Sequence, residues 1–208
     1  YELPKMERWG RLGEGWQFTS VLSLMSGHPF HVNYNFLDDY DGSGEFFGRP
    51  DVIGPVRYNR SDPFRFLDLS AFRVPCTLNP AGGGGAQDCI FNATTGTNSM
   101  HFGTLGRNAL LGPDYRNFDL ALIKVTSLSE RFKLQVRIDF FNLTNHPNFA
   151  NPLLPSFIAD AAPGGLDSTT GISLGFLPIT ATSDVGLGNP ILAGGGPRSV
   201  QIAVKLLF

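Results

Sequence analysis

Alternation of apolar and polar residues marks four segments of the chain. In the segment 133–141 (KLQVRIDFF) almost every second residue is apolar, and most of the residues between them are charged or polar. The segments 16–25, 118–122 and 199–208 follow the same rule. Because successive side chains of a β-strand point to opposite faces, this pattern predicts four strands, each with one apolar face.

The predicted strands are long, at about ten residues each, compared with roughly five or six in soluble sheets. In the second strand the alternation slips around Ile123 and Lys124, which predicts a bulge or the end of the buried span. We expect the four strands at about 15–34, 117–128, 132–144 and 198–208.

The connections between these strands are of two lengths. The short polar turn SLSERF joins the second and third strands, whereas long loops at about 35–116 and 146–197 separate the others. Both loops are rich in Gly, Pro, Asn and Asp, and compact soluble domains seldom contain unstructured connections of this length. Long strands with short turns at one end and long loops at the other are typical of an outer-membrane β-barrel.

We therefore expect an all-β fold: an antiparallel up-and-down transmembrane β-barrel. The chain would provide a C-terminal fragment of about four long strands with two long extracellular loops, as the C-terminal part of a longer precursor. A soluble β-sandwich also alternates apolar and polar residues, and it is the structural alternative. Charges deep within the predicted strands weigh against a sandwich.

The two faces of each strand would meet different surroundings. Lipid offers no hydrogen-bond partners, so backbone groups pair within a closed ring of strands and the apolar side chains contact acyl chains. The opposite face would line the lumen. Because unpaired buried charges are costly, we expect its charged residues to pair across strands or with a plug domain. The alternative is that they lie in water and contribute little to stability. The lumen-facing candidates are Gln135, Arg137, Asp139, Gln201 and Lys205.

Composition excludes several other classes of protein. Charge is nearly balanced, with 16 Lys and Arg against 18 Asp and Glu, so we expect no nucleic-acid partner. Phe is abundant, at 18 residues, which argues against a disordered tail. No stretch approaches the roughly 18 apolar residues of a membrane helix.

Two cysteines, Cys76 and Cys89, lie within one Gly-rich segment. A local pair of this kind suits a disulfide in an oxidising compartment, although two free thiols would give the same sequence. We find no nucleophile–base pair, phosphate loop or pair of catalytic acids, and we expect neither an enzyme nor a bound cofactor.

One acidic segment, DDYDGSGE, partly matches a calcium-binding loop. Asp39, Asp41 and Ser43 occupy alternate positions before Gly44, which would permit the sharp turn of such a loop. The closing acidic ligand is missing, because the twelfth position is Pro50. A solvated acidic turn is the alternative to a calcium site and the interpretation that we favour, so we expect no metal.

Several motifs together resemble the distal barrel of TonB-dependent receptors. The similarity is strongest over 103–152, and the opening run YELP, the segment GWQFTSVLSLMSGHPF and the closing PRSVQIAVKLLF also look like that family. The chain resembles most the Oar-like group, whose precursors carry a carboxypeptidase-regulatory-like domain ahead of the plug. The matching elements are Gly106–Asn108, Gly112–Pro113, Asn117 and Asp119, Lys124, and Arg137–Phe149 (RIDFFNLTNHPNF).

This resemblance implies ligand binding and energised uptake across the bacterial outer membrane. The implied partners are the TonB complex and a plug domain, both outside this fragment, together with outer-membrane lipid and the barrel-assembly machinery. That machinery would recognise Phe208 at the end of the amphipathic last strand. The ligand would be a small molecule, siderophore, glycan or peptide. The alternatives are a non-transporting adhesion or structural barrel, and a secreted β-sandwich binding module.

Overall fold

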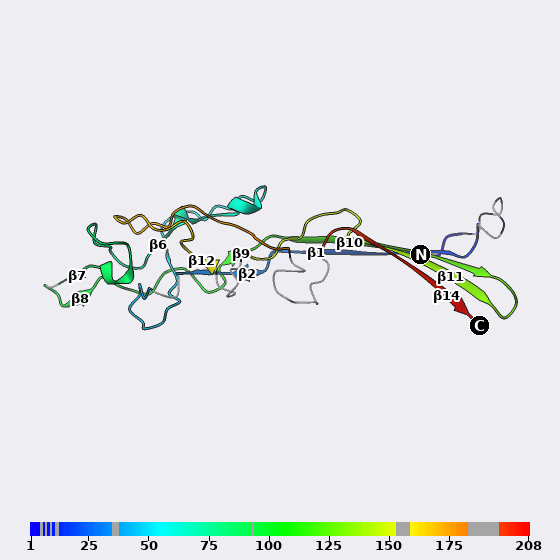
Figure 1. Ribbon diagram of the computed structural model, residues 1–208, viewed down its shortest axis with the longest axis horizontal. Helices are drawn as coiled ribbons and strands as arrows, with labels where there is room; N and C mark the ends of the chain where they lie inside the picture. The colour runs from blue at the N-terminus through cyan, green and yellow to red at the C-terminus, as the bar shows by residue number, and fades with distance from the viewer. Residues whose placement is uncertain are drawn as a thin grey trace. The chain divides into compact units, whose positions relative to one another are not determined.

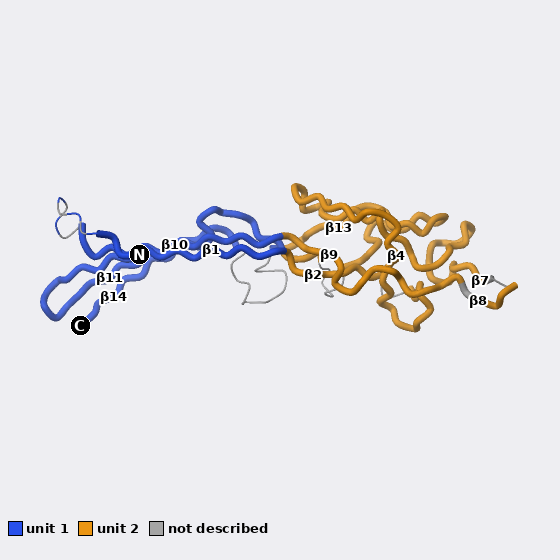
Figure 2. The backbone as a smooth tube through the Cα atoms, turned by 180° about the vertical axis from the view of Figure 1, so that it is seen from behind, with its two compact units in different colours: residues 1–26, 114–149, 182–208 blue, residues 27–113, 150–181 orange. Residues whose placement is uncertain are grey.

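The chain folds into two compact units (Figure 2). Unit 1 comprises 1–26, 114–149 and 182–208, and unit 2 comprises 27–113 and 150–181. The computed structural model describes residues 1–4, 6, 8, 10, 13–34, 38–92, 94–152, 159–182 and 196–208.

Unit 1 is built on one four-stranded antiparallel sheet in the order β1-β10-β11-β14 (Figure 1). The antiparallel all-β architecture predicted from the alternation is confirmed, and the last two long strands, β11 and β14, pair directly. Residues 128–132 form a tight turn between β10 and β11, in which the Leu128 and Ser129 amides donate to the Phe132 carbonyl. The strands are β1 (Trp16–Met25), β10 (Tyr115–Ser127), β11 (Lys133–Phe141) and β14 (Ser199–Leu207).

Two of these strands are shorter than predicted. β1 ends at Met25 rather than at 34, and the chain then passes close to a neighbouring segment at Gly27. A Cβ atom on Gly27 would lie 1.9 Å from the Gly112 carbonyl oxygen, so only glycine allows this approach. β11 ends at Phe141 rather than at 144, because Asn142 has a left-handed backbone, with φ 48°.

The predicted bulge at Ile123 and Lys124 is wrong. Ile123 lies opposite Gln17 and Arg137, and Lys124 lies opposite Trp16 and Val136, in ladders without interruption. The slip in the pattern arises because the polar Lys124 stands on the mostly apolar face and the apolar Ile123 on the polar face, not because the backbone changes register.

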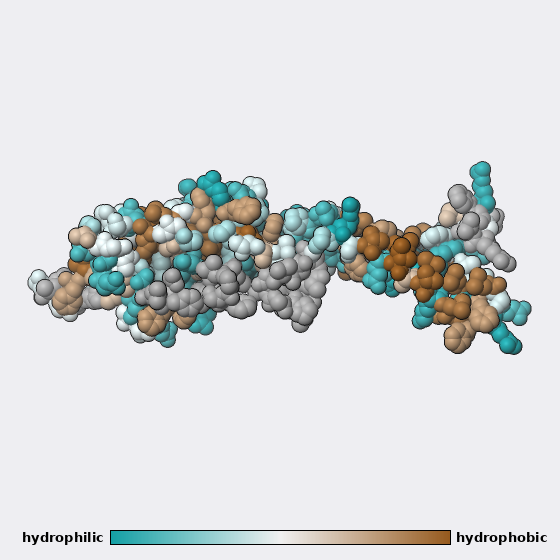
Figure 3. All heavy atoms as spheres, viewed as in Figure 1, coloured by the Kyte–Doolittle hydropathy of each residue, from teal (hydrophilic) through white to brown (hydrophobic). Residues whose placement is uncertain are grey.

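This register gives the sheet an apolar face and a polar face. Side chains of the apolar face are half-buried on β10 and β11 and mostly exposed on β1 and β14, where Ile202 and Val204 are each 67% exposed. Figure 3 shows apolar side chains gathered over the long strands. The apolar face carries Trp16, Phe18, Leu22, Leu24, Phe118, Leu120, Leu122, Leu134, Val136, Ile138, Phe140, Val200, Ile202, Val204 and Leu206.

Unit 2 consists of short strand pairs connected by turns, and the long loops predicted at about 35–116 and 146–197 contribute most of it. Its pairs are β2–β9, β3–β12, β4–β6, β5–β13 and β7–β8. The described strands are β2 (Pro29–Phe30), β3 (Val32–Asn33), β4 (Asp51–Val52), β5 (Leu67–Asp68), β6 (Phe72–Arg73), β7 (Phe91–Asn92), β8 (Thr97–Asn98), β9 (Leu110–Leu111), β12 (Ala159–Asp160) and β13 (Phe176–Leu177).

Three short 3-10 helices complete the secondary structure described in unit 2: η2 (Pro63–Arg65), η3 (Leu69–Ala71) and η4 (Ala86–Asp88). Asp62 and Asp68 cap η2 and η3 by accepting amide hydrogen bonds from Phe64 and Ser70. No helix within the described residues is long and apolar enough to cross a membrane.

Both stretches of unit 2 contribute to one hydrophobic core. Val32, Leu67 and Phe72 come from the first stretch and are fully buried. Ala161 and Leu177 come from the second and are at most 2% exposed. The two long loops are therefore a folded body rather than independent connections.

A disulfide links Cys76 and Cys89 within this body, with their Cα atoms 5.7 Å apart. The Cys76 residue is itself buried, at 5% exposure, and Leu78 forms a β-bridge with Cys89. A bridge of this kind restricts the unfolded chain and thereby stabilises the segment between the two cysteines.

Candidate functional site

The predicted lumen-facing residues share the polar face of the sheet in unit 1. Gln135 lies opposite Lys205, and Asp139 lies opposite Gln201, so the four side chains project from one face with Arg137. That common face follows from the register, whereas what the face meets stays a prediction.

Arg137 and Asp139 form an ion pair along β11, with guanidinium and carboxylate atoms 2.8 Å apart. The Arg137 Nε also donates to Asp139, at 2.9 Å. The two residues pair along one strand rather than across strands. The other expectation, pairing with a plug domain, stays a prediction. Arg137 lies opposite the small Ala203, so its side chain has room to turn along its own strand.

Asparagines of the segment 137–149 tie strand ends together. Asn142 Nδ2 donates to the carbonyls of His146 and Gly196, and its own amide donates to Asp119 Oδ1. Asn148 is fully buried; its Oδ1 accepts from the Arg116 amide and its Nδ2 donates to the Arg116 carbonyl. These motif residues stabilise the sheet, a role that motif matching alone did not predict.

In the acidic segment considered as a calcium loop, the carboxylates accept hydrogen bonds from backbone amides of the same turn. Asp39 and Asp41 both accept a hydrogen bond from the Ser43 amide, at 3.1 and 3.0 Å, and Asp39 also accepts one from the Gly44 amide. Across the described residues, no group of three or more His, Cys, Asp or Glu side chains could hold a metal ion. The alternative interpretation, an acidic turn, accounts for all three contacts.

Phe208, predicted to be an assembly signal, directly follows β14 and is 97% exposed. Its side chain has no role in the described core. Recognition by the assembly machinery stays a prediction.

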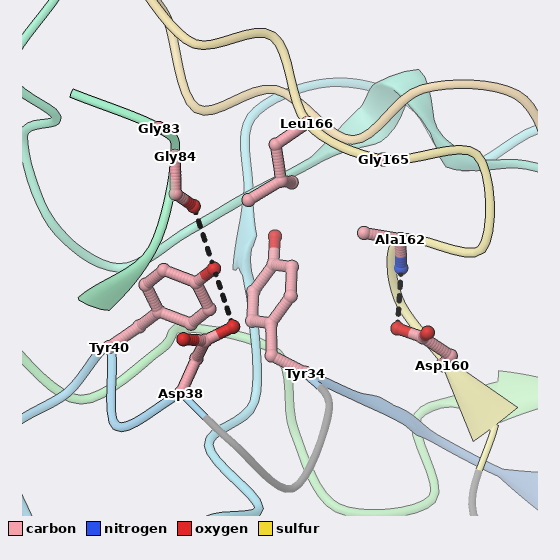
Figure 4. A pocket seen from close by; sticks show the side chains of 9 residues that line it. All are labelled: Tyr34, Asp38, Tyr40, Gly83, Gly84, Asp160, Ala162, Gly165 and Leu166. Carbon is pink, nitrogen blue, oxygen red and sulfur yellow. Dashed lines mark hydrogen bonds between the residues drawn. The ribbon is translucent and has the colours of Figure 1, made fainter. Parts of the chain in front are cut away.

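A first polar pocket in unit 2, called here the tyrosine pocket, has a volume of about 220 Å³ (Figure 4). Tyr40 donates from its hydroxyl to the Gly84 carbonyl at 2.9 Å, and Asp38 Oδ2 lies 3.2 Å away from the same hydroxyl. The Tyr34 hydroxyl lies 3.2 Å from Ser173 Oγ. The polar lining comprises Tyr34, Asp38, Tyr40, Gly84 and Asp160.

Burial changes the acid–base properties of this pocket. It raises the pKa of both Tyr34 and Tyr40 well above the ordinary value, so both hydroxyls remain protonated at neutral pH. Burial also raises the pKa of Asp160, although the Ala162 amide donates to this carboxylate at 2.8 Å. Among the described residues that line the tyrosine pocket none is cationic, so the pocket favours ligands that donate hydrogen bonds over anionic ligands.

A second polar pocket in unit 2, called here the arginine pocket, has a volume of about 260 Å³. Its polar lining differs from that of the tyrosine pocket because it carries charges of both signs. The exposed rings of Phe47 and Phe102 also belong to it. The ionisable and amide side chains that line it are His31, Asn33, Asp41, Glu45, Arg49 and Arg107.

Neighbouring residues of the same segments line the two pockets. Asn33 lines the arginine pocket, and the next residue, Tyr34, lines the tyrosine pocket. Likewise, Tyr40 lines the tyrosine pocket and the next residue, Asp41, lines the arginine pocket. Side chains of an extended segment alternate in direction, which lets one stretch supply both sites at Asn33 and Tyr34. β12 supports this stretch, since the Ala161 amide donates to the Asn33 carbonyl.

Comparison with known families identifies the wider context of both units. A family model described as "Outer membrane beta barrel domain" matches residues 1–182. The match covers β1, β10 and β11 and the whole of unit 2. No curated protein and no solved structure matches the chain.

Proposed function

Because the chain belongs to the family of outer membrane beta barrel domains, we propose that it is part of a TonB-dependent receptor that binds a ligand and imports it. The family match supports a location in the bacterial outer membrane. The long amphipathic strands and the exposed apolar face agree with contact to lipid.

The observation that carries the receptor proposal is the folded state of unit 2. A connection that only returns the chain to the sheet needs neither a core of its own nor a disulfide, and unit 2 has both. The described part of unit 2 also contains the tyrosine pocket and the arginine pocket, and sites that combine a few oriented polar groups in a concave surface are typical of ligand binding.

Import requires a closed wall and a source of energy. Among the described strands, β14 has one hydrogen-bonded neighbour, β11. Its other edge would pair with a further strand of the barrel, because an open edge in lipid leaves backbone groups without partners. The polar face with Arg137 and Asp139 would then meet the plug domain or water.

The test is a binding measurement between the full-length protein in detergent and the purified periplasmic domain of TonB. A receptor forms a complex with this domain, whereas an adhesion or structural barrel does not. In cells, a proton uncoupler should also stop accumulation of the ligand without preventing its binding at the surface. Recovery of the full-length protein in the soluble fraction without detergent would contradict the barrel itself.

A further inference from the structure

The arginine pocket is held open by packing that does not depend on its charged side chains. The segment 102–107 lies against Arg49 and Pro50, and a Cβ on Gly103 would be only 1.8 Å from the Arg49 carbonyl oxygen. The Leu105 amide donates to the Pro50 carbonyl at 3.0 Å. The pocket is therefore preformed, which reduces the entropy that ligand binding has to overcome.

Opposite charges line this pocket without neutralising each other. Within the described residues, Arg49 and Arg107 have no ion pair or side-chain hydrogen bond, and Asp41 and Glu45 have no ion pair. Asp41 instead accepts a hydrogen bond from the amide of its own turn, at Ser43. Charged groups of both signs thus remain available to a ligand.

Asn33 adds a second, independent observation. Its residue is only 8% exposed, and its Oδ1 has no hydrogen-bond partner among the described residues. A buried acceptor without a partner is destabilising. Asn33 lines the arginine pocket, so the wall of this pocket is less well satisfied than an ordinary packed surface.

We propose that the arginine pocket binds a short peptide with free termini. Its carboxylate pairs with Arg49 and Arg107, which suit carboxylates because a guanidinium presents parallel N–H donors. Its ammonium group pairs with Asp41. An apolar side chain of the peptide packs on the exposed rings of Phe47 and Phe102. This assignment names the ligand class of the receptor and rests on the proposed function.

Charge and size separate this ligand from the other classes. A phosphate or another polyanion would be repelled by Asp41 and Glu45, and a polycation by Arg49 and Arg107. A neutral sugar would leave all these charges without a counterion. The volume of about 260 Å³ lies below the roughly 300–1,000 Å³ of drug-sized sites. The pocket therefore suits a dipeptide rather than a long chain.

The test uses full-length protein in lipid nanodiscs and titration calorimetry with the dipeptide Ala-Phe. N-acetylation and C-amidation of the dipeptide remove one charge each. Either change should weaken binding about tenfold, because each removes a charge-assisted hydrogen bond. The double variant Arg49→Gln, Arg107→Gln and the single variant Asp41→Asn should weaken it similarly. The matched control is Arg57→Gln, an exposed arginine outside both pockets, which should bind as well as the wild type.

The proposal is overturned if Ala-Phe does not bind, if its doubly capped form binds equally well, or if the neutral trisaccharide maltotriose binds more tightly. A far-UV spectrum and resistance of unit 2 to protease establish that each variant is folded. Loss of peptide binding with intact TonB binding would reject the ligand class alone. Peptide binding without a TonB complex would instead reject the transport function and leave the peptide site in place.

Discussion

The ammonium group of Lys124 lies 5.2 Å from the centre of the Trp16 ring, directly across the β1–β10 ladder. The same ammonium donates to the Glu14 carbonyl just before β1 begins. Lys124 thus belongs to the apolar face of the sheet, while its ammonium group lies beside Glu14 and Trp16, where β1 begins. Long basic side chains commonly reach a membrane–water boundary in this way, and Trp is enriched there.

Replacing this tryptophan should weaken the anchoring of β1. In full-length protein folded into lipid vesicles, Trp16→Leu should lower the free energy of unfolding by about 1 kcal/mol, because a cation–π contact contributes about that much. Phe18→Leu is the matched control on the same face, and it should lose less. Equal losses in urea unfolding would show that the Lys124–Trp16 contact contributes nothing specific.

An introduced charge should destabilise the protein much more on one face of β14 than on the other. Ile202 and Ala203 are consecutive, but Ile202 belongs to the apolar face and Ala203 to the polar face. Ile202→Arg should destabilise the folded protein in lipid by about 2–4 kcal/mol if it lies near the bilayer midplane. Ala203→Arg should cost far less.

Urea unfolding in vesicles and the gel shift of folded against heated protein both measure this difference. A greater loss for Ala203→Arg than for Ile202→Arg would reverse the assignment of lipid and lumen faces.

Asn148 should be a sensitive position although it lies outside the strands. Asn148→Ala removes both hydrogen bonds to the Arg116 backbone, at 2.7 and 3.0 Å. We expect unfolding to become easier by about 1–3 kcal/mol, the range for backbone groups left without partners. Thr144→Ala is the control, because Thr144 is exposed and, within the described residues, its hydroxyl makes only one long hydrogen bond, 3.4 Å to Asn142 Oδ1. Indistinguishable stabilities of the two variants would show that water replaces the asparagine.

Two aspartates of unit 2 should give pH dependences of opposite sign. Burial raises the pKa of Asp160 above its ordinary value of 3.8, so the folded state holds the proton more tightly than the unfolded state. Its stabilising contribution is present below pH 3.8 and is lost as pH rises through the folded-state pKa. Asp160→Asn should therefore increase resistance of unit 2 to protease at pH 7, and the difference should shrink in acid.

Asp167 is the matched comparison. Hydrogen bonds from the Thr170 amide, the Thr170 hydroxyl and the Thr169 amide lower its pKa. Its contribution is present above the ordinary pKa of 3.8 and is lost as pH falls. Asp167→Asn should therefore reduce protease resistance at pH 7. The same sign of change for both variants at pH 7 would contradict these assignments.

Alternation predicted the sheet well because it reports a local property of each strand. The period of two survives wherever one face is apolar, so β10, β11 and β14 were visible without any knowledge of their partners. It misled at Lys124, where a long side chain satisfies its charge some distance from its Cα while the backbone keeps register. A single charged residue in an apolar row therefore does not require a bulge.

Unit 2 was not predictable in the same way. Its strands have two residues each, too few to show any period. Its pockets combine residues far apart in sequence, such as Tyr34 with Asp160, whose approach depends on a core assembled from both stretches. The acidic run around Asp41 resembles part of a metal-binding loop, but nothing local in the sequence indicates that Arg107 lines the same pocket.

The interleaved construction of unit 2 has a consequence for how such a protein diversifies. β3 pairs with β12 and β5 with β13, so each half of the core depends on the other. Genetic recombination that moved only one of these two stretches into a related barrel would transfer half of the hydrophobic core. That half would lack the strands and side chains against which it packs. Residues 27–113 and 150–181 therefore have to be inherited together, along with the β10–β11 hairpin encoded between them. A new ligand specificity would therefore arise by exchange of the whole segment from 27 to 181, or by single substitutions within the pockets.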